Sequence, residues 1–358
     1  MELIYYSLLL SITTSMAQKN ETPILVLALL ITLGLIGGVY WWLAKSYDIN
    51  LSSFSNNQSQ NNLQSAEKTF KSVKKVPSGL FSYGGSTTWA PIRKEADSVI
   101  ETALPKFQLR YTNPTTGTPG SGTGIKMLLK NQLAFSQSSR PVKDKEYQQA
   151  QQRGFKLEEI PVAIDGIAIA VNPNLNIPGL TLTQLKDIYT GKITNWQELG
   201  GENQPIIPYS KISEGGTVEF FVNNVLKKED FGRNIEKIST TTEALRKVSK
   251  EKGGIYYASA PEVVGQCGIK PLAVGRTEST LVSPYKEPYV PLSECPQKRN
   301  QLNVDAFRSD EYPMTRRLFV VVKKNGQIDE QAGAAYANLL LTDEGQKVIS
   351  KAGFVRIR

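Results

Sequence analysis

Three short stretches of the chain place glycines and hydroxyl side chains just before a helical pattern. They read SYGGSTTW, TPGSGTG and SEGGTVEFF, at residues 82–89, 118–124 and 213–221. A helix begins with backbone N–H groups that lack partners and with a partial positive charge, so such a turn can bind an anion. A single turn of this kind is most often only a helix cap. Three of them in one body indicate donors that converge on an oxyanion with several oxygens, and the glycines allow the backbone to approach it closely.

The composition argues against most other kinds of site. The 358 residues include no histidine, which removes the Ser-His-Asp and Cys-His catalytic sets and most zinc sites. None of the glycine-rich turns closes with the Gly-Lys-Ser/Thr of a Walker A loop or has the Gly-x-Gly-x-x-Gly spacing of a dinucleotide-binding fold. The net charge of +9 suits an anionic partner, but Lys and Arg are spread along the chain and form no nucleic-acid-binding run. We therefore expect a binding protein and not an enzyme, with no cofactor, no metal and no nucleic acid.

Strand-like and helix-like segments alternate along the body of the chain. Apolar runs typical of strands lie at 79–85, 107–114, 160–173 and 318–324, and helical patterns lie at 122–132, 181–191 and 334–353. This alternation predicts an α/β fold with largely parallel sheets. The length of the chain and an apparent crossing near Asp165–Gly166 predict two lobes.

The amino-terminal part has a different composition. Residues 22–44 are apolar and uncharged over a length sufficient to cross a bilayer, and Tyr40, Trp41 and Trp42 stand at the end of the run, where interfacial aromatics are common. We expect residues 1–45 to form a segment with a retained membrane anchor, and a cleaved signal peptide is the alternative. Residues 46–75 are rich in Asn, Gln and Ser and predict a flexible linker. Met16 is an alternative to Met1 as the start of the protein.

Cys267 and Cys295 are the only cysteines of the chain. In a reducing cytosol they would remain free, whereas outside it they would form a disulfide that closes one loop. Because the predicted anchor places the body outside the cytoplasm, we expect the two cysteines to be bonded within the second lobe.

Several segments of the body resemble the periplasmic phosphate-binding proteins of ABC-type phosphate importers, over nearly all of residues 76–358. The most specific are IYTGKITNW at 188–196 and EGQKVISKAGFV at 344–355, and GGSTTWAP, GSGTGIK, FSQSSRPV, GGTVEFF and GGIYYAS accompany them. The resemblance implies a type 2 periplasmic-binding-protein fold, whose two α/β lobes close on one phosphate ion about a hinge. It implies a lobe 1 of about 76–164 with 316–358, a lobe 2 of about 165–315, and a second crossing near Met314–Arg316.

The resemblance also implies which residues bind the phosphate. Hydroxyl groups and backbone amides would donate to its oxygens, and a nearby cation would offset its charge. The expected set is Ser86, Thr87, Thr88, Ser121, Ser138, Ser139, Arg140, Asp165, Lys211, Gly215, Gly216 and Thr217.

Three of these positions depart from the pattern of that family. Ser139 stands where many members have an aspartate that accepts the proton of hydrogen phosphate, Lys211 where they have an arginine, and Gly215 where they have a serine. Lysine carries a point charge and does not reproduce the fork of a guanidinium. Arg140 is the candidate replacement for the positive charge, and Asp165 is the candidate acceptor for the proton.

The expected function is that of an extracytoplasmic solute-binding protein. Held at the bacterial inner membrane by its N-terminal helix, it would capture inorganic phosphate by domain closure and deliver it to the permease of an ABC importer. The alternative is an ectodomain of the same fold that has lost transport duty and acts in sensing or protein interaction, or that binds another tetrahedral oxyanion.

Overall fold

The computed structural model describes residues 68–211 and 215–358. All of them belong to one compact unit, Gln64–Arg358. The predicted anchor at residues 22–44 lies outside the described residues. Among the helices that the structure does describe, none combines the length and the apolar character needed to span a bilayer.

The folded body begins before residue 76, where the sequence places the end of the linker. A short 3₁₀-helix, η2 (Phe70–Ser72), follows Thr69, and the side chains of Phe70 and Val73 are buried in the core of lobe 1. The Phe70 backbone N–H also donates to Glu344 Oε2 at 2.8 Å. Residues 46–75 are polar as a whole, so their composition does not reveal that Phe70 and Val73 pack into the core.

Helices and strands alternate through both lobes. The first part of the chain forms β1 (Gly79–Gly85), η3 (Thr87–Trp89), α2 (Ala90–Ala103), β2 (Phe107–Tyr111), α3 (Ser121–Leu129), β3 (Phe135–Ser138), α4 (Asp144–Gln152) and β4 (Lys156–Val171). The middle part forms β5 (Leu180–Thr181), α5 (Leu182–Thr190), η4 (Trp196–Leu199), β6 (Ile207–Lys211), α6 (Gly216–Asn224), β7 (Glu236–Ile238), α7 (Thr241–Lys250), β8 (Gly254–Ser259), α8 (Ala260–Val263), β9 (Lys270–Leu272) and β10 (Val274–Gly275). The last part forms η5 (Glu278–Thr280), η6 (Leu292–Glu294), α9 (Val304–Arg308), β11 (Thr315–Lys324), α10 (Ile328–Leu341), α11 (Asp343–Lys351) and β12 (Val355–Arg356).

Ten strands share one hydrogen-bonded sheet. Its order is β2-β1-β3-β11-β4-β8-β6-β7, and β9 and β12 also pair with β4. The outer pairs are parallel, as the strand–helix alternation predicts: β1 pairs with β2 and β3, and β6 pairs with β7 and β8. The middle of the sheet is antiparallel, because β4 and β11 run in opposite directions between the lobes.

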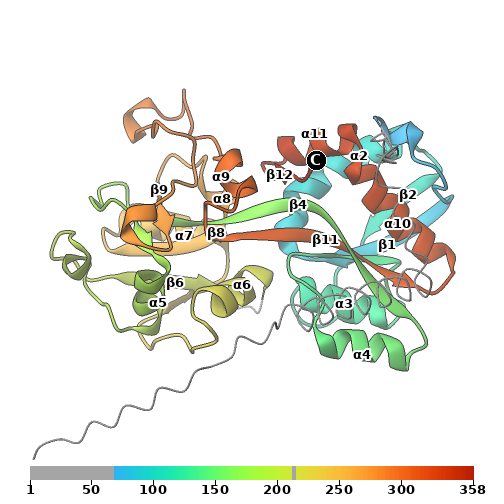
Figure 1. Ribbon diagram of the computed structural model, residues 1–358, viewed down its shortest axis with the longest axis horizontal. Coiled ribbons are helices and arrows are strands. Elements are labelled where there is room, and N and C mark those ends of the chain that lie inside the picture. Colours follow the sequence, from blue (N-terminus) through green and yellow to red (C-terminus); the bar gives the residue numbers. More distant parts are fainter. Residues whose placement is uncertain (1–67, 212–214) are drawn as a thin grey trace, which may run out of the picture. The chain divides into compact units, whose positions relative to one another are not determined.

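Strands β4 and β11 join the two lobes. Figure 1 shows them side by side, running from one group of helices to the other. Val162 and Leu318 belong to the hydrophobic core of lobe 1, whereas Ile167 and Met314 belong to the core of lobe 2. The chain therefore changes lobe within a few residues of the crossings that the sequence predicts, and these residues lie opposite one another in a paired ribbon.

Lobe 2 contains the predicted disulfide between Cys267 and Cys295, whose Cα atoms are 5.6 Å apart. The bond ties the segment after α8 to the residues that follow η6. Helix η6 and the segment around it bury few side chains, and Leu292 is 54% exposed. The crosslink therefore restrains a part of lobe 2 that the hydrophobic core holds only weakly.

We expect removal of this crosslink to destabilise lobe 2 measurably. Closing a loop of this size lowers the entropy of the unfolded chain, which corresponds to about 3–4 kcal/mol of stability. The Cys267→Ser/Cys295→Ser variant should unfold at lower denaturant concentration than the parent. Thiol titration of the denatured parent purified from the cell envelope should detect no free thiol, and finding two would contradict the assignment.

Candidate oxyanion-binding site

Three of the predicted hydroxyl groups meet at one point. The Ser86 hydroxyl donates to Ser139 Oγ at 2.9 Å, and Ser121 Oγ lies 3.2 Å from the same oxygen. Ser121 Oγ also accepts a hydrogen bond from the Ser139 backbone N–H at 3.0 Å. Each of these side chains is buried. The first turn, the second turn and the end of β3 thus converge, as the sequence predicts; we call Ser86, Ser121 and Ser139 the serine cluster.

A glycine brings the first turn against β3. Gly85 ends β1 with a φ of 126°, and a Cβ atom there would lie 2.2 Å from the Gln137 carbonyl oxygen. The backbone can therefore approach β3 closely, and the Ser86 N–H donates to that same carbonyl at 2.8 Å. Trp89 Nε1 donates to the Ser138 carbonyl at 3.1 Å, which fixes the turn on its other side.

The third turn reaches the serine cluster from lobe 2. Gly215 is the N-cap residue of α6, and Gly216 is its first residue. A Cβ atom on Gly216 would lie 2.2 Å from Ser139 Oγ and 3.1 Å from Ser121 Oγ. The amino-terminal end of α6, with its unpaired N–H groups and partial positive charge, therefore adjoins the serine cluster.

The cation of the site is Arg316, which is not among the site residues that the sequence predicts. Its side chain is 4% exposed, and its Nη2 donates to Thr88 Oγ1 at 3.1 Å and to Thr217 Oγ1 at 3.0 Å. The guanidinium therefore joins a hydroxyl of the first turn to a hydroxyl of the third. Its Nη1 is buried and has no hydrogen-bond partner among the described residues. A buried guanidinium nitrogen without a partner is unfavourable, and an oxyanion would satisfy it.

Asp165 holds Arg316 in place. The two residues are register partners on β4 and β11, and Asp165 Oδ2 accepts from Arg316 Nε at 3.0 Å and from Nη2 at 2.8 Å. Asp165 Oδ1 accepts from the Ser259 hydroxyl at 2.6 Å. Complete burial raises the pKa of Asp165, while the charge of Arg316 and the Ser259 hydrogen bond act in the opposite direction. The Asp165 side chain is completely buried, and it binds Arg316 through one oxygen and Ser259 through the other, so Asp165 orients Arg316.

Arg140 lies at the site but is bound to carboxylates. Its Nη1 and Nη2 donate to Glu146 Oε2 and Oε1 at 2.9 and 2.7 Å, and its Nε lies 3.0 Å from Glu219 Oε2. These contacts raise the pKa of Arg140 against the opposing effect of burial, which is the largest single influence. The charge of Arg140, which we expected to serve the anion, is thus already balanced by two acidic side chains.

Three further predicted residues form no described hydrogen bond with the serine cluster or with Arg316. Thr87 is exposed at the start of η3, and the Ser138 hydroxyl donates to the Arg140 carbonyl at 2.7 Å. Lys211 ends β6, directly before residues 212–214, which the structure does not describe.

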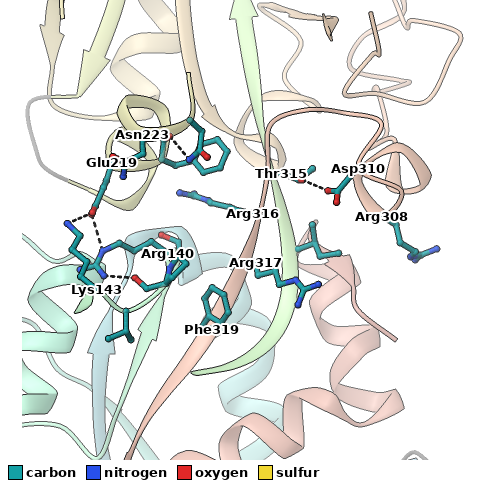
Figure 2. A pocket seen from close by; sticks show the side chains of 16 residues that line it. Arg140, Lys143, Glu219, Asn223, Arg308, Asp310, Thr315, Arg316, Arg317 and Phe319 are labelled. Atoms are coloured by element: carbon teal, nitrogen blue, oxygen red, sulfur yellow. Dashed lines mark hydrogen bonds and ion pairs between the residues drawn. The ribbon is translucent and has the colours of Figure 1, made fainter. Parts of the chain in front are cut away.

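A cavity of about 570 Å³ opens between the lobes beside these residues. Ser139 and Arg140 line it from lobe 1, Glu219 and Phe220 line it from α6, and Arg316 lines it from β11. Figure 2 shows the Arg316 side chain pointing from β11 into the space between Arg140 and α6. Arg316 and Ser139 thus connect this cavity to the serine cluster and to the start of α6 behind it, and these donors together suit an oxyanion.

Comparison with known proteins agrees with this geometry. The profile of the PBP superfamily domain, the superfamily of periplasmic-binding proteins, matches residues 65–344. The chain belongs to this superfamily. The match begins close to η2, where the folded body begins in the structure.

Curated relatives of this superfamily member are phosphate-binding proteins. The phosphate-binding protein PstS of Staphylococcus epidermidis is 28% identical over 277 residues, which cover 76% of this chain and 77% of the relative. The PstS of Staphylococcus aureus has the same identity over 277 residues, which cover 76% of each chain. These relatives are solute-binding proteins and not enzymes, so the prediction of a non-enzymatic chain is confirmed.

Solved structures share the fold. A substrate-binding protein assigned to phosphate ABC transport in Clostridium perfringens, solved with bound phosphate, superimposes with a TM-score of 0.62 at 25% identity, covering 78% of this chain and 100% of that one. An ABC-type phosphate transport receptor from Vibrio cholerae gives a TM-score of 0.60 at 21% identity and covers 77% of this chain and 99% of its own, which supports the fold alone. The predicted two-lobe α/β periplasmic-binding-protein fold is therefore confirmed.

Proposed function

We propose that this chain is an extracytoplasmic solute-binding protein that captures inorganic phosphate between its lobes for an ABC importer. The observation that carries the proposal is the buried guanidinium of Arg316, whose Nη1 has no partner in the described part of the chain and whose Nη2 contacts hydroxyls from both lobes. The names of the curated relatives and the phosphate bound in the Clostridium perfringens structure support the same ligand.

Phosphate capture assigns roles to the predicted residues. The serine cluster and the hydroxyls of Thr88 and Thr217 would donate to the phosphate oxygens, together with the backbone amides of Gly216 and Thr217 at the start of α6. Arg316 would supply the positive charge, held by Asp165. Since the donors come from both lobes, a bound phosphate would hold the lobes together, which is how ligand binding would signal to a permease.

The place of the protein in the cell is part of the same proposal. We assign residues 22–44 as a retained anchor in the inner membrane, with the lobes on its extracytoplasmic face. The apolar, uncharged run of that segment supports the anchor, and the disulfide of lobe 2 supports an oxidising compartment. We keep lobe 1 as about 76–164 with 316–358 and lobe 2 as about 165–315, with the short extension to Phe70. Resistance to extraction by carbonate at high pH would support the anchor, and a soluble form that begins after about Ala44 would contradict it.

A second candidate ligand follows from the burial of Asp165. Hydrogen phosphate carries a proton that sulfate lacks, whereas Asp165 is completely buried against Arg316 and Ser259 and position 139 is a serine and not an acidic residue. This observation favours the alternative that the site takes another tetrahedral oxyanion. Calorimetric titration of the full-length chain with phosphate, sulfate and molybdate decides between them. Saturable phosphate binding supports the proposal, tighter binding of another oxyanion supports the alternative, and no heat from a folded protein indicates an ectodomain without this ligand.

We expect the Thr217→Val and Ser121→Ala variants each to bind phosphate more weakly than the parent. A hydrogen bond to a charged group contributes about 1.5–3 kcal/mol, so the dissociation constant should rise roughly 10- to 150-fold. Helix caps alone would predict a loss of about 1 kcal/mol in stability with unchanged affinity. Thr123→Val is a matched control, because the Thr123 hydroxyl donates to the Thr118 carbonyl at 2.9 Å near the surface. If both site variants bind phosphate like the parent, the turns are caps and the assigned site is wrong.

A further inference from the structure

A carboxylate from lobe 2 reaches across the cleft to two cations of lobe 1. Glu219 lies in the first turn of α6, Arg140 follows β3, and Lys143 precedes α4. Glu219 Oε2 lies 3.0 Å from Arg140 Nε, and Glu219 Oε1 forms an ion pair with Lys143 Nζ. Figure 2 shows both contacts converging on the Glu219 carboxylate from the side of lobe 1. We call these three residues the interlobe bridge.

Burial shields the Arg140–Glu219 pair of the interlobe bridge from water, whereas the Lys143 side chain is 44% exposed. The Glu219 side chain is 20% exposed and that of Arg140 only 8%, so water screens their interaction poorly. Arg140 is also held rigidly, because Glu146 binds its other two nitrogens. The first turn of a helix further stabilises the negative charge of Glu219 through the helix dipole. Separating the lobes would break both ion pairs and leave Glu219 without a cation among these partners.

The interlobe bridge stands between two openings of the cleft. On one side it borders the cavity of about 570 Å³ that Arg316 and Ser139 also line. On the other side it borders a cavity of about 1130 Å³, onto which Lys126, Lys145 and Lys228 face. All three bridge residues line both cavities. The interlobe bridge is therefore part of the wall of both cavities, and opening it would widen the connection between them.

We propose that Glu219 is a positioning residue that fastens the lobes and limits the release of the bound anion. The proposal rests on the proposed function for its ligand, although the fastening itself requires only the contacts described above. In the described part of the chain, Glu219 forms no hydrogen bond or ion pair with the serine cluster or with Arg316, so it acts through lobe closure and not as an anion ligand.

The test compares the release of radiolabelled inorganic phosphate from three forms of the full-length chain. Glu219→Gln keeps the shape of the side chain and removes the charge that binds Arg140 and Lys143. We expect its dissociation rate constant to rise about tenfold or more, since losing one partner of a buried charge pair acts mainly on dissociation. The matched control is Glu229→Gln, which makes the same change of charge in lobe 2, where Glu229 pairs with Lys186 and Lys192 of the same lobe. The control should release phosphate at the parent rate.

A second pair of variants separates the interlobe bridge from a general effect of charge. Lys143→Met should raise the release rate by less than Glu219→Gln, because Arg140 remains paired with Glu219. The Lys143→Met/Glu219→Gln variant should release phosphate no faster than Glu219→Gln alone, because both pairs depend on the one carboxylate. Equal release rates for the parent and Glu219→Gln would overturn the proposal, and so would additive effects of the two substitutions.

A measurement of the distance between the lobes in the absence of ligand tests the interlobe bridge independently of the proposed function. Spin labels at Lys130→Cys in lobe 1 and Lys237→Cys in lobe 2, both exposed positions, report the distance between lobes in the full-length chain. We expect a longer or broader distance distribution for Glu219→Gln than for the parent, and no change for Glu229→Gln. If the parent binds no phosphate but Glu219→Gln still opens the lobes, the proposed ligand fails and the interlobe bridge stands. Identical distributions in the parent and in Glu219→Gln would overturn the interlobe bridge.

Discussion

The Arg316→Met variant is expected to lose phosphate binding and much of its stability together. The substitution removes the cation that contacts Thr88 and Thr217, and it leaves Asp165 fully buried without its partner. Breaking a buried ion pair from one side costs about 3–5 kcal/mol. The loss of a charged donor to the anion weakens binding by at least roughly 10- to 150-fold. Denaturant unfolding measures the first effect, and calorimetric titration with phosphate measures the second.

A double variant separates these two effects. Arg316→Met with Asp165→Asn removes the unpaired buried charge, so most of the lost stability should return, while the phosphate affinity should stay as low as in Arg316→Met. The matched control is Arg356→Met, which removes the same side chain from β12, where it is exposed and lines neither cavity. That variant should resemble the parent in both measurements. A double variant that binds phosphate as tightly as the parent would show that Arg316 only holds the two crossing strands together.

The sequence predicted the hydroxyl turns because their signal is local. Gly-Gly-Ser-Thr-Thr before α2, Gly-Ser-Gly-Thr-Gly at α3 and Gly-Gly-Thr at α6 each stand at a strand-to-helix junction that a short window of sequence reveals. Parallel strands with helices between them bring such junctions to the same edge of a sheet. The meeting of Ser86, Ser121 and Ser139 follows from that topology and required no knowledge of side-chain packing.

Arg316 was not predicted because its role depends on the pairing of two strands that lie far apart in the sequence. Its partner Asp165 was a candidate, and the chain crossing near residues 314–316 was predicted, but only the pairing of β4 with β11 places the two side chains opposite each other. A usable signal did exist. A charged residue in each of two apolar crossing strands is costly to bury unless the two charges meet.

Arg140, in contrast, was predicted to serve the anion, but in the structure it binds acidic side chains. Its position next to Ser139 in the sequence suggested that its charge would serve the anion. In the structure its guanidinium turns to Glu146 at the start of α4 and to Glu219 on the other lobe. Nothing within a short window reveals the second of these partners, because the contact exists only when the lobes are together. Two residues that are adjacent in sequence have backbones close together. The direction of a long side chain, however, depends on the charges around it.

The Gly216→Ala variant is expected to fold at least as well as the parent and to lose phosphate affinity by roughly tenfold or more, a size typical of the coupling between closure and binding. Gly216 begins α6 without a positive φ, so alanine suits its backbone, and replacing glycine by alanine in a helix stabilises it by up to about 1 kcal/mol. The added Cβ would lie 2.2 Å from Ser139 Oγ, which belongs to the other lobe. The clash therefore opposes closure of the lobes and leaves each lobe intact.

The Ser139→Ala/Gly216→Ala variant tests this explanation, because it removes the oxygen that the new methyl group would strike. The nearest atom of residue 139 to that Cβ would then be its own Cβ, at 3.5 Å, an ordinary contact distance. Ser121 Oγ, at 3.1 Å, would need to shift by only a few tenths of an ångström. We expect the interlobe distance of the double variant, measured with phosphate present and with the same spin labels, to return to that of the parent. Its affinity should equal that of Ser139→Ala alone, so that the second substitution adds no further loss. If Gly216→Ala instead closes and binds phosphate like the parent, Ser139 turns aside without penalty, and the contact between α6 and the serine cluster does not control closure.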